Sequence, residues 1–577
     1  MKLWVSIIIL MIFSCTPEQK IEENIPINQP HLLVDYLKNP QPQKRQIAAF
    51  YLGQTRDSNF TQVLISSFEN TDTAGIFAQS NATILEALGK TGNKEILDYL
   101  TDISTYKNTD TALHTGRMSA IYEFGLREIT TESGTKVAIE YISDLTMPEK
   151  SRFYAAHYLG RVKNIHLENY APRIHLALSR ESNPYIKMAL ITAAGRTQDT
   201  LFVSPLIEII QKENDPRIVV NALRALVNFD HHKISELLLE NLNHPDWSVV
   251  WTAANLLLEK GTPSDAFSYY ELAKSTEDIP IKIILLRATL KYLPAYSTIT
   301  KENAQGQLLK LFQNSPEPHI RSNAILALAE NPNSIVLFKE KGLKDSAALV
   351  RKTTMQILRV SNLLNEDYLN VKDPSLLYEA ALGFSGENKK AKELGKIALS
   401  TLKLPENLEV AMTISSLTGD SVPLLEEYYY NQKSTNEYSL ATIQTSKGNI
   451  KLELYPDVAP LSVSAFIGLI EKEFYNGLTF HRVVPNFVIQ GGCPIGDGLG
   501  GPDFLLKTET GLIYYDQPGR VGLASAGSGT EGSQFFITHS PAPHLNGKYT
   551  IFGQVISGME VVNSIREGDV IQKIILE

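Results

Sequence analysis

The sequence predicts a multidomain protein in which an all-α solenoid of helical hairpins precedes a small antiparallel β-barrel with flanking helices. The chain has 577 residues, which is too long for a single hydrophobic core. Segments of one shape recur about every 35 residues between 31 and 430, as they do in solenoid proteins. After a polar linker at 431–437, the apolar residues change from helical spacing to strict alternation, which indicates strands.

The composition is that of a globular protein, with 43% hydrophobic and 20% charged residues. The formal net charge is -9 and the sequence pI is about 5.8. No dense run of Lys and Arg stands out, which argues against nucleic acid as a partner. Of the two cysteines, we expect Cys493 to be a small buried hydrophobic residue rather than a reactive thiol.

The first 30 residues predict a leader and a tether. Lys2 precedes the apolar run 3–13, which is too short to span a membrane and is typical of a secretory signal. The end of this run, Ile12 to Cys15, resembles the lipobox of bacterial lipoproteins. That resemblance implies a signal peptide at 1–14 and a lipid on Cys15, the alternative being an ordinary signal peptide with an incidental cysteine. Residues 15–30 are polar and predict a flexible tether.

The repeats of the predicted array each end in a small apolar stretch and a glycine. Examples are IAAFYLG, ATILEALG, SAIYEFG, YAAHYLG and LITAAG, which end at Gly53, Gly89, Gly125, Gly160 and Gly195. Small residues at helical spacing allow two helices to approach closely. We expect the terminal glycines to adopt the left-handed conformation that ends a helix.

Prolines mark where the next helices begin. Asn or Asp followed by Pro, as at 183–184 and 215–216, predicts a capped first turn, and His244-Pro245 and Glu317-Pro318 occupy similar places. The units DPRIVVNALRAL and PHIRSNAILALA resemble HEAT repeats. A tetratricopeptide array has a similar period, but its aromatic signature is absent. Such an array offers an extended surface without chemistry of its own, and we expect Trp247 and Trp251 to belong to its core.

The last segment, 438–577, predicts a barrel. Ile450, Leu452 and Leu454 alternate with charged residues after a turn at 446–449, which indicates a hairpin, and a helix is expected at 461–472. The stretch TFHRVVPNFVIQGG at 479–492 is almost entirely apolar or small. It nevertheless contains Arg482 and Gln490, eight residues apart, and such residues are unexpected in a buried strand.

The stretches FHRVVPNFVIQGG and GSQFFITHS resemble two diagnostic segments of the cyclophilins, a family of barrel-shaped peptidyl-prolyl cis/trans isomerases. The resemblance covers 438–577 and implies that Arg482 and Gln490 are catalytic. It also implies a set of substrate-binding positions: Phe487, Val488, Ala524, Ser525, Gln534, Phe536, His544, Leu545 and Tyr549. His544 stands where many eukaryotic members have tryptophan, Tyr549 where many have histidine, and Ser525 where asparagine is common.

The chemistry of such an enzyme explains the residue types. Rotation about an X–Pro bond must cross a barrier of about 18–20 kcal/mol because it destroys amide resonance, yet no covalent bond breaks. The reaction therefore needs an apolar slot for the proline ring and a donor for the prolyl nitrogen, and it requires no metal or cofactor. The planar guanidinium of Arg482 suits the role of donor.

Three features of this segment also have simpler interpretations. Outside this motif, an arginine such as Arg482 would more often be a salt-bridged strand residue. His481 is expected on the opposite strand face in a structural role. Residues 496–501 formally satisfy GxGxxG, but Pro502 follows them and no βαβ unit surrounds them, which argues against dinucleotide binding.

The sequence therefore predicts a lipid-anchored prolyl isomerase in a bacterial cell envelope, acting on proline-containing polypeptides outside the cytoplasm. The resemblance to bacterial lipoproteins, with Thr16 rather than Asp after the cysteine, implies the outer membrane, facing the periplasm. The rival hypothesis is a non-catalytic scaffold that uses both domains for protein–protein interaction. Two roles stay open for the array at 31–430, namely binding client proteins and docking the enzyme to an envelope assembly.

Overall fold

The computed structural model describes residues 25–577 except 71, 73, 103–109, 231–232, 295–296, 365–370, 385–398, 401, 420–421, 423–424 and 433–437. The predicted signal peptide, Cys15, most of the tether and most of the linker thus lie outside the described residues. The chain forms two compact units, which divide between Arg180 and Glu181. No helix within the described part of the chain is both long and apolar enough to cross a bilayer.

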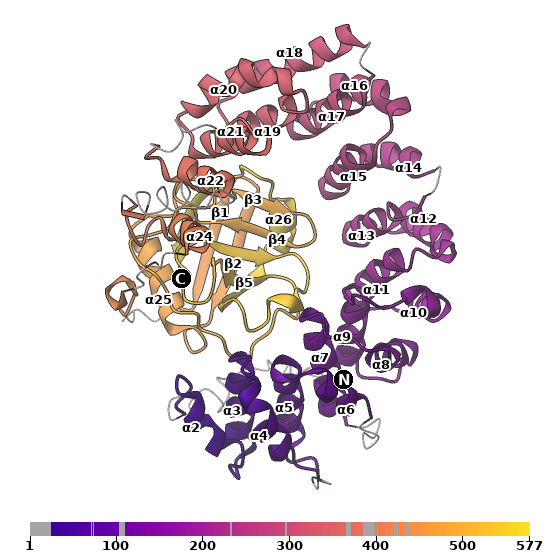
Figure 1. Ribbon diagram of the computed structural model, residues 1–577, viewed down its shortest axis with the longest axis vertical. Coiled ribbons are helices and arrows are strands. Elements are labelled where there is room, and N and C mark those ends of the chain that lie inside the picture. Colours follow the sequence, from indigo (N-terminus) through magenta and orange to yellow (C-terminus); the bar gives the residue numbers. More distant parts are fainter. Residues whose placement is uncertain are drawn as a thin grey trace, which may run out of the picture. The chain divides into compact units, whose positions relative to one another are not determined.

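The first unit is a run of paired helices (Figure 1). Helices α3, α5, α7 and α9 pack on one another in series, and α4, α6, α8 and α10 alternate with them along the chain. The helices are α2 (Pro30–Tyr36), α3 (Pro42–Gln54), α4 (Thr61–Ser67), α5 (Ala78–Thr91), α6 (Lys94–Asp102), α7 (Thr111–Leu126), α8 (Glu132–Ser143), α9 (Glu149–Leu159) and α10 (Ala171–Arg180).

The second unit continues the array and also contains the barrel. Its inner layer consists of the successively packed helices α11, α13, α15, α17, α19 and α21, and the alternate helices lie outside them (Figure 1). The helices are α11 (Pro184–Thr197), α12 (Val203–Lys212), α13 (Pro216–Leu226), α14 (Ile234–Glu240), α15 (Trp247–Lys260), α16 (Ala266–Ser275), α17 (Ile279–Tyr292), α18 (Thr298–Asn314), α19 (Pro318–Leu328), α20 (Ile335–Leu343), α21 (Ala348–Val360), α22 (Pro374–Phe384) and α24 (Leu408–Thr418).

Two of the predicted Asx-Pro caps are confirmed. Asn183 accepts hydrogen bonds from the backbone N–H groups of Tyr185 and Ile186 at 2.9 and 3.2 Å, and Asp215 caps α13 in the same way. Pro245 does not begin a helix, because Asp246 is the N-cap of α15 and binds the N–H of Ser248 at 2.8 Å.

The expectation that the five repeat glycines adopt the left-handed conformation that ends a helix is wrong. Gly53, Gly89, Gly125 and Gly195 lie inside α3, α5, α7 and α11, and Gly160 caps α9 in a right-handed conformation. The left-handed position after α11 is taken by Gln198, with φ 55°. Of the glycines in the series, Gly419 does end its helix this way, with φ 76° after α24.

The repeat glycines instead allow neighbouring helices to touch. A Cβ on Gly89 would lie 2.6 Å from the backbone oxygen of Ala120 in α7, and one on Gly195 would lie 2.8 Å from the Cα of Ala225 in α13. Only hydrogen fits in such gaps. The small residues flanking these glycines, such as Ala48 and Ala253, are fully buried as expected.

Trp247 and Trp251 are only half-buried, so the prediction that they belong to the core is wrong. Both line a cavity of about 510 Å³ together with Val483 and Arg566 of the barrel. The Nε1 of Trp247 donates to the carbonyl oxygen of Asn563 at 2.7 Å. Helix α15 of the array contacts the barrel here. The local hydrophobic pattern of α15 could not predict this contact, because the barrel is distant in the sequence.

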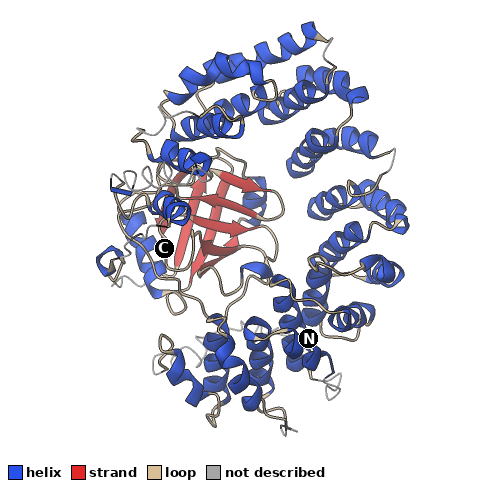
Figure 2. Ribbon diagram, in the orientation of Figure 1, coloured by secondary structure: helices blue, strands red, loops and turns tan. Residues whose placement is uncertain are grey.

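The barrel is an antiparallel sheet with the strand order β3-β4-β6-β5-β7-β2-β1-β8 (Figure 2). The strands are β1 (Leu440–Thr445), β2 (Gly448–Leu454), β3 (Arg482–Val484), β4 (Val488–Gly491), β5 (Arg520–Leu523), β6 (Phe535–Thr538), β7 (Ile551–Ser557) and β8 (Ile571–Leu576). A bridge between Thr479 and Val570 joins the chain just before β3 to the chain just before β8 and closes the sheet. The expected hairpin and helix are confirmed as β1–β2 and α25 (Pro460–Glu471), and α26 (Met559–Ser564) follows β7.

The barrel core explains why β1, β2 and α25 have their apolar patterns. Ile443 and Ile450 are paired across the first hairpin and are fully buried. Phe466 of α25 packs against Phe535 and Phe552 with ring centroids 5.8 and 5.1 Å apart. This aromatic cluster fixes α25 against the sheet.

Packing at the repeat glycines generates a test with a matched control. Gly89→Ala should destabilise the protein by about 1–3 kcal/mol, because the new methyl group overlaps α7. Gly306→Ala should stabilise it by about 0.5–1 kcal/mol, because Gly306 lies inside α18 with nothing within 4 Å of its Cβ position. Chemical denaturation followed by circular dichroism measures both, and equal shifts for the two variants would contradict the close packing.

Candidate active site

A cavity of about 350 Å³ lies against residues of β3, β4 and β6. It gathers nearly all the substrate-binding and catalytic positions expected in the barrel: Arg482, Phe487, Val488, Gln490, Ala524, Ser525, Gln534, Phe536, Leu545 and Tyr549. His544 is the exception, because it does not line the cavity and instead stacks on Phe487 with ring centroids 5.4 Å apart. Cys15, the predicted lipid site, lies outside the described residues.

Strand register brings the key side chains into one row. Arg482 of β3 is paired with Gln490 of β4, Gln490 with Phe536 of β6, and Phe536 with Gly522 of β5. Residues paired in this way project from the same face of a sheet, with Cβ atoms about 5 Å apart. The eight-residue separation of Arg482 and Gln490 is therefore the spacing of hairpin partners around a tight turn, at which Asn486 adopts φ 63°.

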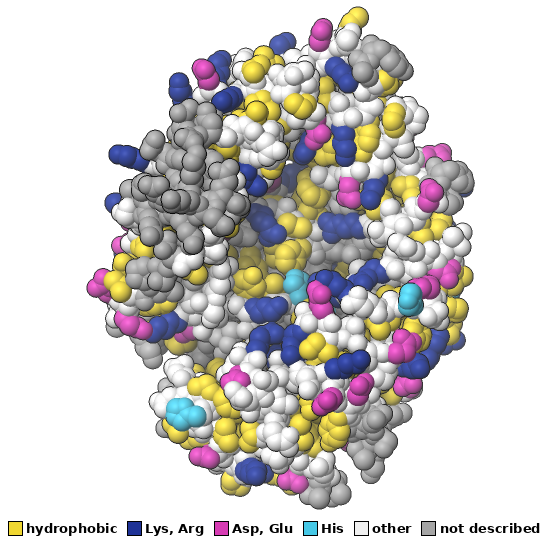
Figure 3. Space-filling view, viewed as in Figure 1, with side chains coloured by type: hydrophobic (Ala, Val, Ile, Leu, Met, Phe, Trp, Pro, Cys, Tyr) yellow, Lys and Arg dark blue, Asp and Glu magenta, His cyan; other side chains and the backbone are white. Residues whose placement is uncertain are grey.

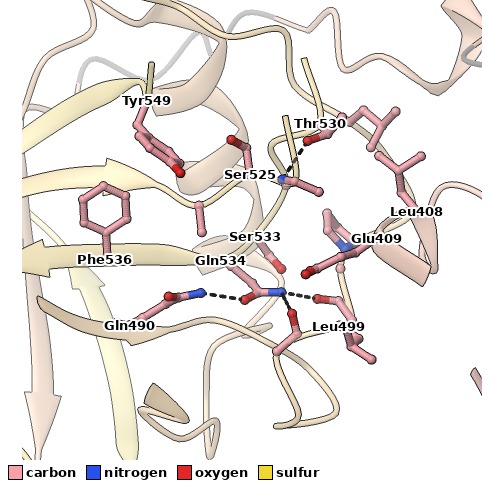
Figure 4. A pocket seen from close by; sticks show the side chains of 18 of the residues that line it. Leu408, Glu409, Gln490, Leu499, Ser525, Thr530, Ser533, Gln534, Phe536 and Tyr549 are labelled. Atoms are coloured by element: carbon pink, nitrogen blue, oxygen red, sulfur yellow. Dashed lines mark hydrogen bonds between the residues drawn. The ribbon is translucent and has the colours of Figure 1, made fainter. Parts of the chain in front are cut away.

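A chain of amide hydrogen bonds fixes the glutamine beside the arginine. Gln490 Nε2 donates to Gln534 Oε1 at 3.1 Å. Gln534 Nε2 donates in turn to the carbonyl oxygens of Gly498 and Gly500, both at 2.9 Å (Figure 4). The loop that formally matched GxGxxG thus uses its carbonyl groups to hold Gln534.

The guanidinium of Arg482 is exposed at the mouth of the cavity. It lies 6.0 Å from the centroid of the Phe487 ring and makes no hydrogen bond or ion pair with any residue that the structure describes. The alternative interpretation, in which Arg482 is a salt-bridged strand residue, therefore does not hold among the described residues. The donors of this permanent cation remain available to a ligand.

The other end of the row is an apolar slot. Val488, Phe536 and Leu545 are 2%, 6% and 8% exposed, and Tyr549 meets the ring of Phe536 edge-on at 5.8 Å. Beneath them, the buried ring of Tyr515 stacks on Phe536 at 5.7 Å. The slot has the apolar character that a proline ring requires.

Tyr515 and Gly522 support this slot and were missed by sequence reasoning. A Cβ on Gly522 would lie 2.1 Å from Tyr515 Oη and 2.6 Å from the Phe536 ring. The glycine therefore makes room for both aromatic rings. No local pattern reveals this, because the requirement arises only when β5 is paired with β6.

Half-buried His481 and buried Cys493 lie near the loop 496–501. Burial lowers the pKa of His481 to about 4, which keeps the imidazole neutral at neutral pH. Burial also raises the pKa of the Cys493 thiol, which agrees with the expected small hydrophobic role. Neither residue lines the cavity.

The loop 496–501 is anchored to the array. The buried carboxylate of Asp497 accepts from the N–H of Leu499 at 2.8 Å and from Ser375 Oγ of α22 at 2.6 Å. Lys352 Nζ of α21 donates to the carbonyl oxygen of Asp497 at 3.0 Å. These contacts link array helices to the loop that holds Gln534, a link that sequence reasoning did not anticipate.

Comparison with known proteins identifies the family of the C-terminal domain. The family model described as cyclophilin type peptidyl-prolyl cis-trans isomerase/CLD matches residues 440–575. Peptidyl-prolyl cis-trans isomerase B of Bacillus subtilis is 50% identical over 129 residues, which are 22% of this chain and 90% of that protein. This chain belongs to the cyclophilin family. Residues 440–575 are accordingly a peptidyl-prolyl cis-trans isomerase domain, and the cavity described above is its candidate active site.

Other similarities cover the same region or the array. A peptidyl-prolyl cis-trans isomerase of Helicobacter pylori (strain J99) is 42% identical over 154 residues, which are 26% of this chain and 95% of that protein. A crystal structure of a Cryptosporidium parvum cyclophilin is 33% identical and covers 24% of this chain and 98% of its own, with a TM-score of 0.24. The HEAT repeat model matches residues 170–259, which confirms the repeat class for that part of the array.

Proposed function

We propose that this protein is a lipid-anchored cyclophilin that accelerates X–Pro isomerisation in proteins outside the cytoplasm of a bacterium. The observation that carries the catalytic part is the register that sets the free guanidinium of Arg482 beside Gln490, at the mouth of an apolar slot. A module that only bound proline-containing segments would need the slot but not the free donor.

The geometry favours the twisted amide over both planar forms. As the X–Pro bond rotates, its nitrogen loses conjugation and becomes a hydrogen-bond acceptor, which it is not in either ground state. With the proline ring in the slot of Phe536, Val488 and Leu545, Arg482 would donate to this nitrogen. An interaction made only in the transition state lowers the barrier without tightening substrate binding.

Substitution of Arg482 tests the catalytic proposal. In the full-length protein, Arg482→Ala should lower kcat/KM on a short X–Pro peptide by about 10²–10³, the usual cost of losing one transition-state donor. Arg482→Lys should be intermediate, because it keeps the charge but loses the planar fork. A protease-coupled assay gives the rates. The melting temperature should not change, because the exposed side chain bonds to no described residue.

Membrane attachment is the second part of the proposal, and it is supported by the leader and by Cys15. Cys15→Ala should abolish lipid labelling and move the protein from the membrane to the soluble fraction. The other cysteine provides the matched control, because Cys493 is buried in the barrel and Cys493→Ala should leave labelling and fractionation unchanged. Persistent membrane partition of the Cys15 variant would refute the anchor.

For the array, we propose that its inner layer holds client proteins next to the active site. The hollow inner side of α13 and α15 carries Lys and Arg side chains (Figure 3). Trp251 lines two cavities on this side, of about 510 and 380 Å³. Hollows that combine a partly exposed aromatic ring with cationic side chains suit a polypeptide. The alternative, docking to an envelope assembly, predicts a different result in the following experiment.

Two aromatic residues separate these alternatives. Trp251→Ala, on the inner helix α15, should slow catalysed refolding of a proline-limited protein about fivefold and leave turnover of a short peptide unchanged. Phe267→Ala removes an aromatic ring that is 51% exposed on the outer helix α16, and it should alter neither rate. If Trp251→Ala matches wild type on the protein substrate, docking is the better account of the array.

A further inference from the structure

The active-site cavity is not built by the cyclophilin domain alone. Pro405, Glu406, Leu408 and Glu409, at and just before the start of α24, line the same cavity as Arg482 and Gln490. Figure 4 shows Leu408 and Glu409 on one side of the cavity, across from Phe536 and Tyr549. The array therefore supplies one wall of the space in which substrate would lie.

This wall is held in place by contacts on either side of it. The backbone N–H of Gly501 donates to the carbonyl oxygen of Glu406 at 3.2 Å. Leu499, which is 4% exposed, packs in one apolar cluster with Val410 and Ile414 of α24 and Leu377 of α22. The hydrogen bond from Ser375 to Asp497 lies beside this cluster. The first turn of α24 is thereby fixed against the loop 496–501.

The residues of this wall change the net charge of the cavity lining from positive to negative. Of the residues that line it, Arg482 is the charged side chain that comes from the cyclophilin domain, and Glu406 and Glu409 are the two that come from the array. A cyclophilin domain without α24 would present a single cation to its substrate. With α24 in place, two carboxylates outnumber it.

Glu409 has a cationic neighbour, Lys352, but no ion-pair partner among the residues that the structure describes. It is half-buried and makes no hydrogen bond or ion pair with any described residue. Burial raises the pKa of its carboxyl, the nearby carboxylate of Asp497 adds to the rise, and Lys352 opposes it. The ammonium of Lys352 instead binds the carbonyl oxygen of Asp497 and lies 5.2 Å from the ring of Tyr378. A partly desolvated carboxylate without a partner is costly, and a cation supplied by a ligand would relieve that cost.

We propose that Glu409, assisted by Glu406, makes this enzyme select proline-containing segments that carry Lys or Arg close to the proline. The inference rests on the isomerase activity proposed above and names the substrate class of that site. A basic side chain next to the bound proline would reach the carboxylates of the α24 wall. An acidic one would meet like charge, so the wall both attracts one class of segment and rejects another.

The test uses the full-length protein and short peptides with one proline. In each series, one position from three residues before to two residues after the proline is Lys, Ala or Glu. For wild type, kcat/KM should favour Lys over Glu about tenfold at one or more positions. Glu409→Gln should reduce this ratio to about threefold, and the double variant Glu406→Gln/Glu409→Gln should bring it to about one.

Glu427→Gln is the matched control, because Glu427 is an exposed carboxylate that follows α24 and does not line the cavity. It makes the same charge change and should preserve the wild-type ratio. Raising the ionic strength to about 0.5 M should reduce the wild-type ratio, because the attraction between charges is screened. No Lys preference in wild type, or a preference that Glu409→Gln leaves intact, would overturn the inference.

The failure of this inference is distinguishable from failure of the proposed activity. If wild type accelerates the Ala peptide but does not discriminate between Lys and Glu, the selection is wrong and the isomerase stands. Binding of the same peptides, followed by fluorescence anisotropy, measures selection without turnover. A Lys preference in binding, lost in Glu409→Gln and without acceleration of any peptide, would support the selection and overturn the isomerase.

Discussion

The pairing of Arg482 with Gln490 across the β3–β4 hairpin is the constraint on which the candidate active site depends. Side chains alternate between the two faces of a strand, so a shift of one residue would turn both toward the barrel core. Hydrogen bonds of the turn residue Asn486 oppose this shift in strand register. Its Oδ1 accepts from Ser540 Oγ at 2.6 Å, and its Nδ2 donates to the carbonyl oxygen of Arg217 in α13 at 3.3 Å. Barrel and array therefore both hold the hairpin.

The carboxylate of Asp497 connects the array to that hairpin from the other side. It is 6% exposed and binds Leu499 of its own loop and Ser375 of α22. The loop presents two carbonyl oxygens to Gln534, and Gln534 holds Gln490. In a buried network of this kind the orientation of each amide depends on the next bond. The array thus contacts both the turn that sets the catalytic register and the loop that orients the glutamine.

The array contributes in a second way, through the chemistry of its inner surface. Close helix packing at Gly195 contributes to the inner layer of the second unit, and partly exposed residues of that layer and of α24 contact or face the cyclophilin domain. Arg566 of that domain lies over the ring of Trp247 and pairs with Asp278 of the array at 2.5 Å. Glu409 is likewise an array residue next to the cyclophilin domain, and it lines the cavity that contains Arg482. A repeat array without catalytic groups can in this way shape what an attached enzyme accepts.

The sequence by itself determined the order of array and barrel, several helix starts, the first hairpin with its following helix, and most of the residues that line the cavity. Those features depend on local signals, namely helical periodicity, strand alternation, proline caps and two contiguous motifs around Arg482 and Gln534. The tertiary structure alone decided the roles of the repeat glycines, the exposure of Trp247, the support of the slot by Tyr515 and the presence of Glu409 in the cavity. Each of these depends on a partner that is distant in the chain or on a different element. A hydrophobic pattern tells which face of an element is covered, but it does not tell what covers it.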